Sequence, residues 1–172
     1  PAAQEARGLG DVYKRQEKIL NDLKDEPING LAFCVGSIDL KPLKLTKKSD
    51  FMQSFNLNLI SATEVIKTLA DNLKKNKGSV VLFSTVAVKQ GFPNHAIVSS
   101  AKGAVEGLAL ALAAEYAPNI RVNCIAPSLT NSKISNFLLK NEKMAESIAK
   151  MHPLKRIGEG EDSASVAKFL LT

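Results

Sequence analysis

The segment HAIVSSAKGAVEG, residues 95–107, combines a single lysine with small and apolar neighbours at helical spacing. On a helix, side chains four residues apart lie one turn apart on the same face. The residue four positions before Lys102 is Val98, which can neither give nor take a proton. A buried lysine could tune a reacting group, whereas an exposed one would be an ordinary solvated side chain. The segment belongs either to an enzyme that lacks its acid or to a protein without catalysis.

Three apolar runs and the helices between them are expected to position this segment. Each run is short, aliphatic and bounded by glycine or proline, which is typical of a buried strand. The stretches between them carry apolar residues at helical spacing. The expected strands are 28–36, 78–86 and 119–127, and the expected helices are a tail at 17–26, then 49–75 with Ser49 as N-cap, 94–117, 132–151 and one from Asp162.

Alternation of strands and helices predicts an α/β protein with a doubly wound, Rossmann-like parallel sheet covered on both faces. In such sheets ligands bind beyond the carboxyl ends of the strands. Gly36, Ser84 with Thr85, and the turn at 126–128 should therefore share one functional edge. Nothing strand-like precedes 28–36 and the chain ends at FLLT, so we expect the N-terminal βαβ part to be missing and the C-terminus to be truncated.

Composition restricts the classes of function. The 172 residues suit one domain, with 45% hydrophobic residues and a formal charge of +6 that is spread along the chain. Spread charge disfavours a nucleic-acid or membrane-surface role, and no apolar run approaches the roughly 20 residues of a membrane span. Cys34 and Cys124 lie in apolar runs without metal-ligand spacing, so we expect buried free thiols, no metal site and a cytoplasmic location.

The first sixteen residues do not resemble the rest. The segment RGLGDVYKRQ, residues 7–16, resembles a translated sequencing adaptor of the kind found on metagenomic gene fragments. Its GLG is not a phosphate loop, because no strand precedes it and Tyr13 stands where a third glycine belongs. We expect 1–16 to be non-native and 17–172 to be the C-terminal part of one domain.

The chain from residue 17 onward resembles the short-chain dehydrogenase/reductase family. The resemblance rests on segments that agree in order and spacing with the family's strand ends, helix asparagine, catalytic helix and late Arg-x-Gly-x-x-Glu-Asp stretch. These segments are LAFCVGS, FNLNLIS, LFSTVAV, VSSAKGAVEGLALALAAEYAP, IRVNCIAPS and HPLKRIGEGEDSASVAKFLL. The resemblance implies hydride transfer between a nicotinamide and a carbonyl or alcohol carbon.

The resemblance also implies roles for three side chains. Lys102 matches the lysine that lowers a tyrosine pKa and holds the cofactor ribose. Asn58 matches the helix asparagine that orders a water, and Thr85 takes the place of the serine that polarises the substrate oxygen. Val98 stands where the family has its catalytic tyrosine. Losing a positioned acid typically costs about 10²–10⁴ in rate, so the expected active site is atypical.

Other matched positions concern the cofactor, which the resemblance implies to be NAD or NADP. Gly36 is the retained strand-end glycine, and Pro127 with Ser128 fits the Pro-Gly turn beside the nicotinamide, while Thr130 or Ser132 fits a cofactor-contacting hydroxyl. The resemblance further implies a homodimer or homotetramer through the helices around Asn58 and Lys102. Without a glycine-rich loop, the fragment alone is expected to bind cofactor poorly.

Each of these positions also has a structural interpretation. Asn58 could be a packing asparagine, Thr85 a strand residue and Ser128 or Thr130 a helix cap. His95 and His152 are read as a cap or surface histidine and a turn residue. The sequence therefore predicts an NAD(P)-dependent short-chain oxidoreductase acting on an unnamed carbonyl or alcohol substrate. The alternative is an inactive nucleotide-binding or structural relative within an oligomer.

Overall fold

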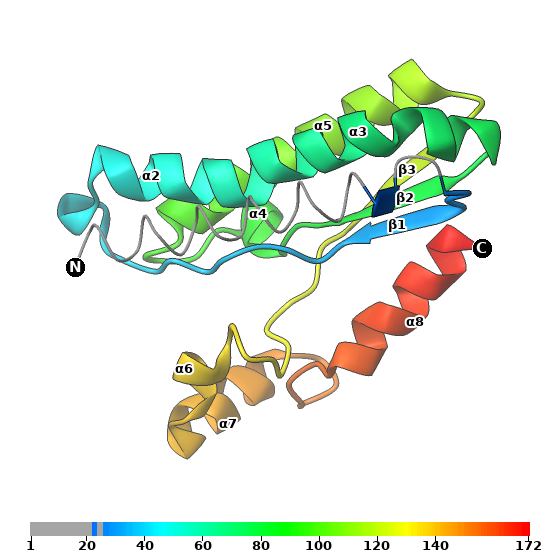
Figure 1. Cartoon of the computed structure of the whole chain (residues 1–172). Helices are drawn as coiled ribbons and strands as arrows, with labels where there is room; N and C mark the ends of the chain where they lie inside the picture. Colours follow the sequence, from blue (N-terminus) through cyan, green and yellow to red (C-terminus); the bar gives the residue numbers. More distant parts are fainter. Residues whose placement is uncertain (1–21, 24–25) are drawn as a thin grey trace.

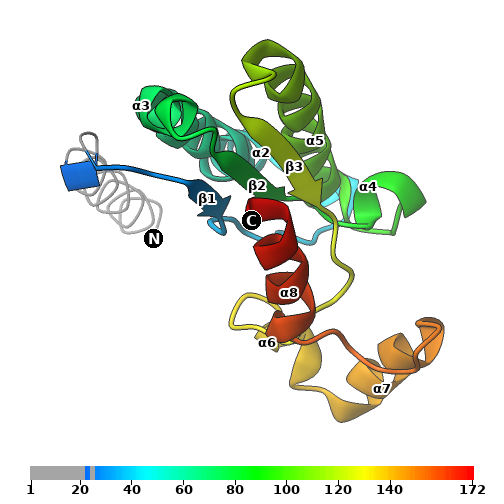
Figure 2. The same cartoon turned by 90° about the vertical axis from the view of Figure 1, so that its right-hand side faces the viewer.

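The computed structural model describes residues 22–23 and 26–172, and in this part a parallel sheet is the centre of the fold. Its strands are β1 (Gly30–Phe33), β2 (Ser79–Phe83) and β3 (Arg121–Ile125), in the order β1-β2-β3. Figures 1 and 2 show helices on both sides of it. The predicted α/β sheet with helical crossovers is confirmed. The segment 1–16 and most of the expected tail at 17–26 lie outside the described residues.

β2 is the central strand of the described sheet. Val80, Val81 and Leu82 are fully buried, in keeping with its β-branched composition. β1 differs from its prediction as a buried strand, because it is shorter and Gly30 and Ala32 are exposed. The described part pairs β1 with β2 on one side only, which makes it an edge strand. For the same reason Cys34 is exposed, so its expected burial was wrong.

The crossover from β1 to β2 is one continuous helical rod with an irregular centre. It consists of α2 (Lys48–Phe55), the π-helical turn η2 (Asn56–Ile60) and α3 (Ser61–Lys75), after a short 3₁₀ turn η1 (Leu43–Leu45). Ser49 is not the N-cap: the rod begins at Lys48, and the N–H of Lys47 donates to Asp50 at 2.8 Å. The apolar face of α3 is buried on the sheet through Ile66, Leu69 and Leu73.

The crossover from β2 to β3 contains α4 (Ala87–Gln90) and α5 (Ala96–Tyr116). The predicted helix at 94–117 is confirmed within two residues at its N-terminal end. Among the described helices, α5 alone is long and apolar enough to span a membrane by length and composition, so the expectation that no apolar run approaches this length was wrong. It packs along β3 and contributes Val105 and Ala109 to the core, as a core helix of similar composition does.

The chain after β3 leaves the sheet and returns. α6 (Asn136–Leu139) and α7 (Glu142–Met151) form a lobe away from the sheet, which the view in Figure 1 shows below it. The expected single helix at 132–151 is broken at Asn141, whose side chain caps α7 by accepting from the Met144 N–H at 3.1 Å. A bridge between Thr130 and Gly158 joins the two connections to this lobe.

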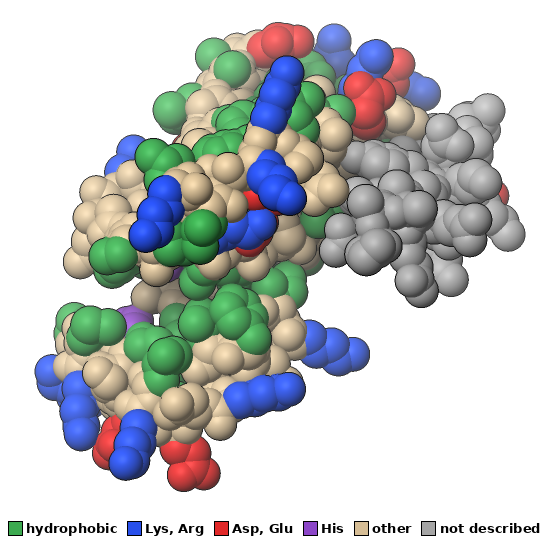
Figure 3. Space-filling model, turned by 90° about the vertical axis from the view of Figure 1, so that its left-hand side faces the viewer, with side chains coloured by type: hydrophobic (Ala, Val, Ile, Leu, Met, Phe, Trp, Pro, Cys, Tyr) green, Lys and Arg blue, Asp and Glu red, His purple; other side chains and the backbone are tan. Residues whose placement is uncertain are grey.

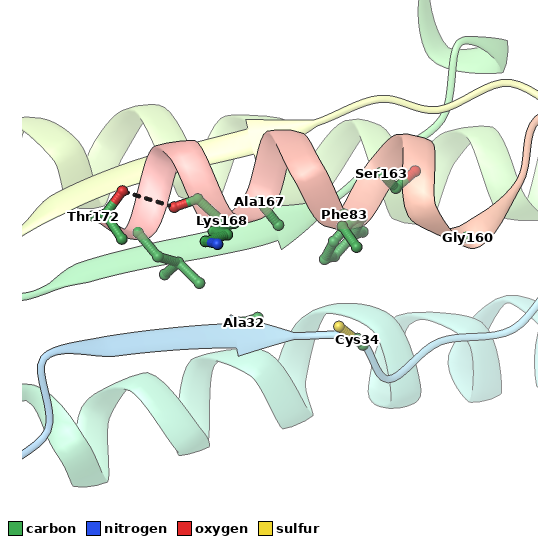
Figure 4. Close-up of a pocket in the computed structure, with 10 residues that line it drawn as sticks. Ala32, Cys34, Phe83, Gly160, Ser163, Ala167, Lys168 and Thr172 are labelled. Atoms are coloured by element: carbon green, nitrogen blue, oxygen red, sulfur yellow. Dashed lines mark hydrogen bonds between the residues drawn. The ribbon is translucent and has the colours of Figure 1, made fainter.

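α8 (Gly160–Leu171) covers the face of the sheet opposite α3 and α5 (Figure 2). Its last turn is tied down because Ser79 Oγ and Arg121 Nη1 donate to the Leu170 carbonyl at 2.7 and 2.8 Å. A hollow of about 610 Å³ lies between α8 and the exposed side of β1 (Figure 4). Its lining is mainly apolar and includes Cys34 and Phe83.

Candidate functional site

Asn58 lies in the π-helical turn η2 and is almost completely buried, at 1% exposure. Its Nδ2 donates to the Ser54 carbonyl at 2.9 Å and to Ser37 Oγ at 3.3 Å. Its Oδ1 accepts from the Ser37 N–H at 3.3 Å. The amide therefore has a fixed orientation and connects the helical rod to the loop after β1. π-helical turns of this kind often occur at functional sites.

Gly36 brings that loop close to two other elements. A methyl group at its α-carbon would lie 2.7 Å from Asn58 Oδ1 and 3.1 Å from Lys102 Nζ. Any side chain here would collide with a buried amide, so the close approach requires glycine. The structure thus brings Gly36, Asn58 and Lys102 to one point at the carboxyl edge of the sheet.

Lys102 projects from α5 toward the end of β2. Its Nζ donates to the Phe83 carbonyl at 2.8 Å. Burial lowers the pKa of this amine, with an opposing influence from the nearby Cys124. An ammonium carries three N–H donors, and the Phe83 carbonyl takes one of them. Lys102 is therefore a partly buried, anchored cation at the sheet edge rather than a solvated surface lysine.

The strand end at β2 supplies two hydroxyl groups with different environments. Ser84 is buried, and its Oγ donates to Glu106 Oε1 at 2.7 Å. Thr85 is half-buried, and its Oγ1 accepts from the Ala87 N–H at 3.3 Å. This local bond uses a lone pair of the hydroxyl and leaves its hydrogen free to donate. Of the two, Thr85 is the one whose hydroxyl can serve a ligand.

Val98 lies one turn before Lys102 on α5 and is 3% exposed. The tyrosine in the described residues is Tyr116, at the opposite end of α5, where it packs against the core. Tyr13 lies outside the described residues. No phenol in the described part of the chain therefore reaches Lys102.

The turn after β3 lies beside the end of β2, because the Val86 N–H donates to the Pro127 carbonyl at 3.1 Å. The three hydroxyls that follow are all engaged. Ser128 Oγ lies 2.6 Å from His152 Nε2, Thr130 Oγ1 donates to the Ser128 carbonyl at 3.0 Å, and Ser132 Oγ lies 3.0 Å from the Oγ of the buried Ser135. Thr130 and Ser132 thus shape the turn.

Sequence reasoning missed the contact between Ser128 and His152, which are 24 residues apart. It placed His152 in a turn, and the Lys155 N–H does bond to the His152 carbonyl at 2.9 Å. His95 occupies the N-cap position of α5, but its ring does not cap the helix. Its Nδ1 contacts the Pro93 carbonyl at 2.8 Å and the ring packs against Phe92.

Comparison with known proteins identifies the family. Residues 13–172 match the family described as enoyl-(acyl carrier protein) reductase. The chain belongs to the short-chain dehydrogenase/reductase family. The human dehydrogenase/reductase SDR family member 2, mitochondrial, is 29% identical across 94% of this chain and 59% of its own length. Tropinone reductase-like 3 of Erythroxylum coca is 34% identical across 73% of this chain and 48% of its own length.

Solved structures of short-chain dehydrogenase/reductases share the fold. A tyrosine-to-phenylalanine variant of ElxO with NADPH bound superposes with a TM-score of 0.82 at 27% identity, covering 92% of this chain and 66% of that one. A gluconate 5-dehydrogenase from Burkholderia cenocepacia in complex with NADP and tartrate gives 0.84 at 20% identity over 91% and 63% of the chains, a likeness of fold alone. The chain spans about half to three fifths of its first curated relatives.

Proposed function

We propose that the protein is an NAD(P)-dependent oxidoreductase of short-chain type that acts on a carbonyl or alcohol. The observation that carries this proposal is the convergence of Gly36, Asn58 and Lys102 at the carboxyl edge of a parallel sheet, where this class of fold binds its ligands. The NADPH- and NADP-bound forms of ElxO support the choice of cofactor.

The residues present fit such a cofactor. Gly36 lets the loop after β1 approach Asn58 and Lys102 closely, and Lys102 keeps N–H donors beyond the one used on Phe83. In the proposed function the nicotinamide supplies or accepts a hydride. Lys102 holds the ribose hydroxyls, Asn58 keeps the loop at Gly36 in place and orders a water, and Thr85 donates to the substrate oxygen. The turn from Pro127 through Ser128, Thr130 and Ser132 borders the cofactor.

Proton transfer is the atypical part of the proposal. Val98 takes the place of the family's tyrosine, and its side chain is apolar and buried. The alternative function, an inactive nucleotide-binding or structural relative in an oligomer, depends on the same residue. Val98→Tyr in the whole protein distinguishes the two. Turnover that appears only in the variant favours an inactive parent, whereas turnover already present in the parent favours an atypical enzyme.

The substrate is specified only as a carbonyl compound or an alcohol. The names of the relatives include reductases of tropinone and hydroxynaphthalene, and those of the solved structures include gluconate dehydrogenases, so they favour no single carbonyl.

We also propose how the chain is organised and assembled. Residues 17–172 form one Rossmann-like domain, and 1–16 are a non-native segment. The protein forms a homodimer or homotetramer through the helices that carry Asn58 and Lys102, and its location is cytoplasmic.

Cofactor titration tests the proposal. NADH and NADPH are titrated against the whole protein and against Lys102→Ala, with nicotinamide fluorescence as the readout. Loss of a charged hydrogen bond costs about 1.5–3 kcal/mol, so affinity should fall roughly 10- to 150-fold. Lys74→Ala, which removes an exposed lysine from the last turn of α3, should bind as the parent does. Absence of binding in the parent would contradict the oxidoreductase function.

A further inference from the structure

Ser128 and His152 form a hydrogen-bonded pair whose proton positions follow from its partners. His152 Nδ1 lies 2.9 Å from the Ile148 carbonyl, which can only accept, so Nδ1 carries a hydrogen. In the neutral ring Nε2 is then an acceptor, and at 2.6 Å it receives the Ser128 hydroxyl hydrogen. Ser128 thus donates to a base, the His152 ring, and the Ile148 carbonyl holds that ring in place. Activated hydroxyl groups in enzymes have this arrangement.

The pair lies at the same edge of the sheet as the candidate site. Ser128 follows Pro127, and Thr85 precedes Val86; the Val86 N–H donates to the Pro127 carbonyl at 3.1 Å. Ser128 and Thr85 are therefore the direct chain neighbours of the two residues that this hydrogen bond joins. Figure 3 shows a hollow between the body that contains the sheet and the lobe of α6 and α7, with histidine side chains, in purple, at its border. Because Ser128 directly follows Pro127, a ligand at this edge of the sheet would meet the pair.

We propose that Ser128 and His152 form the proton relay of this site, with Ser128 as the group that contacts the substrate oxygen. The inference rests on the proposed oxidoreductase function. When hydride from NAD(P)H reduces a carbonyl, the oxygen needs one proton. Ser128 Oγ gives its hydrogen to that oxygen and takes one from Nε2 of the protonated imidazole. His152 is left neutral and recovers a proton from solvent. In alcohol oxidation the same protons move in reverse.

Other groups at the edge are less suited to this task. Val98 has no proton to give, and the Lys102 amine is anchored on the Phe83 carbonyl. Thr85 has no base among its hydrogen-bond partners in the described residues. A histidine, in contrast, changes charge between about pH 5 and 8 and is the commonest general acid or base.

The direct contacts of His152 are neutral. Its hydrogen-bond partners, the Ile148 carbonyl and the Ser128 hydroxyl, carry no charge. α7 and the segment after it carry both signs of charge, with Glu142, Lys143, Glu146, Lys150 and Lys155, whereas α6 (Asn136–Leu139) has no charged residue. The Lys150 ammonium is paired with Glu146 at 3.5 Å. No carboxylate is paired with the imidazole in the described residues, so the relay depends on the ring itself.

The first test reads the histidine directly, without cofactor or substrate. The sequence contains two histidines, and His95→Asn leaves His152 as the single ring in the spectrum. We expect the ¹⁵N shifts to show the tautomer protonated at Nδ1, and Ser128→Ala to change the Nε2 shift and the titration of the ring. A ring protonated at Nε2, or one whose titration ignores Ser128→Ala, would overturn the relay.

The second test measures carbonyl reduction in the whole protein. His152→Asn keeps an amide donor for the Ile148 carbonyl and removes the nitrogen that contacts Ser128. We expect kcat to fall about 10²-fold or more in His152→Asn and in Ser128→Ala, and His152→Asn should leave NADPH affinity unchanged within twofold. The parent rate should fall as pH rises through the imidazole range, and this limb should be absent from both variants. His95→Asn, the matched control, should keep the parent rate and profile.

The outcomes separate the relay from the proposed function. Turnover that survives in both variants, or a loss confined to His95→Asn, would overturn the relay while leaving an oxidoreductase. A parent that binds NADPH but reduces no carbonyl would overturn both. Thermal melts of each variant show whether a loss of rate reflects unfolding, and if His152→Asn unfolds, Ser128→Ala together with the pH profile decides.

Discussion

Asn58 Oδ1 and the α-carbon of Gly36 are so close that a methyl group on the glycine would lie 2.7 Å from the oxygen. The amide cannot easily move away, because its Nδ2 is bonded to the Ser54 carbonyl at 2.9 Å and its Oδ1 to the Ser37 N–H. The contact fixes the loop after β1 against the π-helical turn. It also places the loop beside Lys102, which is the basis of the candidate site.

Gly36→Ala should disturb that contact. Forcing a methyl group into a packed site costs typically about 1–3 kcal/mol, so we expect the free energy of unfolding to fall by that amount. The check is urea unfolding followed by circular dichroism. Gly160→Ala at the start of α8 is the control, because its methyl group would meet nothing within 4 Å. Alanine there should stabilise the helix by up to about 1 kcal/mol. Equal effects at both positions would contradict the close approach.

Lys102 should give stability a pH dependence of predictable sign. Burial lowers the pKa of its amine in the fold, so the unfolded chain binds more protons in the window between that lowered pKa and the usual value of about 10.4. The contribution of Lys102 to the free energy of unfolding therefore rises with pH in that window. Below the window, burial of the charged amine destabilises the fold. The advantage of Lys102→Met over the parent in urea midpoint should be largest at pH 7 and shrink toward pH 10. A difference that does not vary with pH would contradict this linkage.

The sheet could be predicted from sequence because its signal is local. Runs such as Val80–Val81–Leu82 are apolar, rich in β-branched residues and bounded by turn residues, and α5 is continuous and mainly apolar. The strand ends then share one edge by topology alone, which predicts that Gly36 and Thr85 lie at the same edge of the sheet.

What sequence could not predict depends on tertiary contacts. The π-helical turn at Asn58 replaces regular helix where the amide bonds to Ser37 across the fold, and no periodicity encodes that. The exposure of Cys34 depends on which strands pair with β1, not on the apolar run around it. Ser128 and His152 lie in two turns far apart in the sequence. The local sequence of each turn is explained by a helix cap or a bend, so it gives no sign of the contact between them.

The two cysteines should differ in reactivity. Burial raises the pKa of the Cys124 thiol to about 11, so only about one thousandth of it is thiolate at pH 8. Cys34 is exposed and lines the hollow beside α8 (Figure 4). Ellman's reagent at pH 8 should titrate one thiol rapidly and the second at least about tenfold more slowly. Cys34→Ser should abolish the fast phase, and a fast phase that persists would contradict the assignment.

The proposed oligomer makes a prediction about α5. Its outward side is apolar and open: Leu110 is 75% exposed, and the space beside Gly107 is empty within 4 Å. A second copy packed there would bury Leu110, so Leu110→Glu would place a charge in an apolar contact. Light scattering at micromolar concentration should then show a shift toward monomer of about tenfold or more in dissociation constant. Leu154→Glu, at 76% exposure on the segment after α7, is the matched control and should leave the mass unchanged. A parent that is already monomeric, or a shift of equal size in both variants, would rule out this helix as the contact between copies.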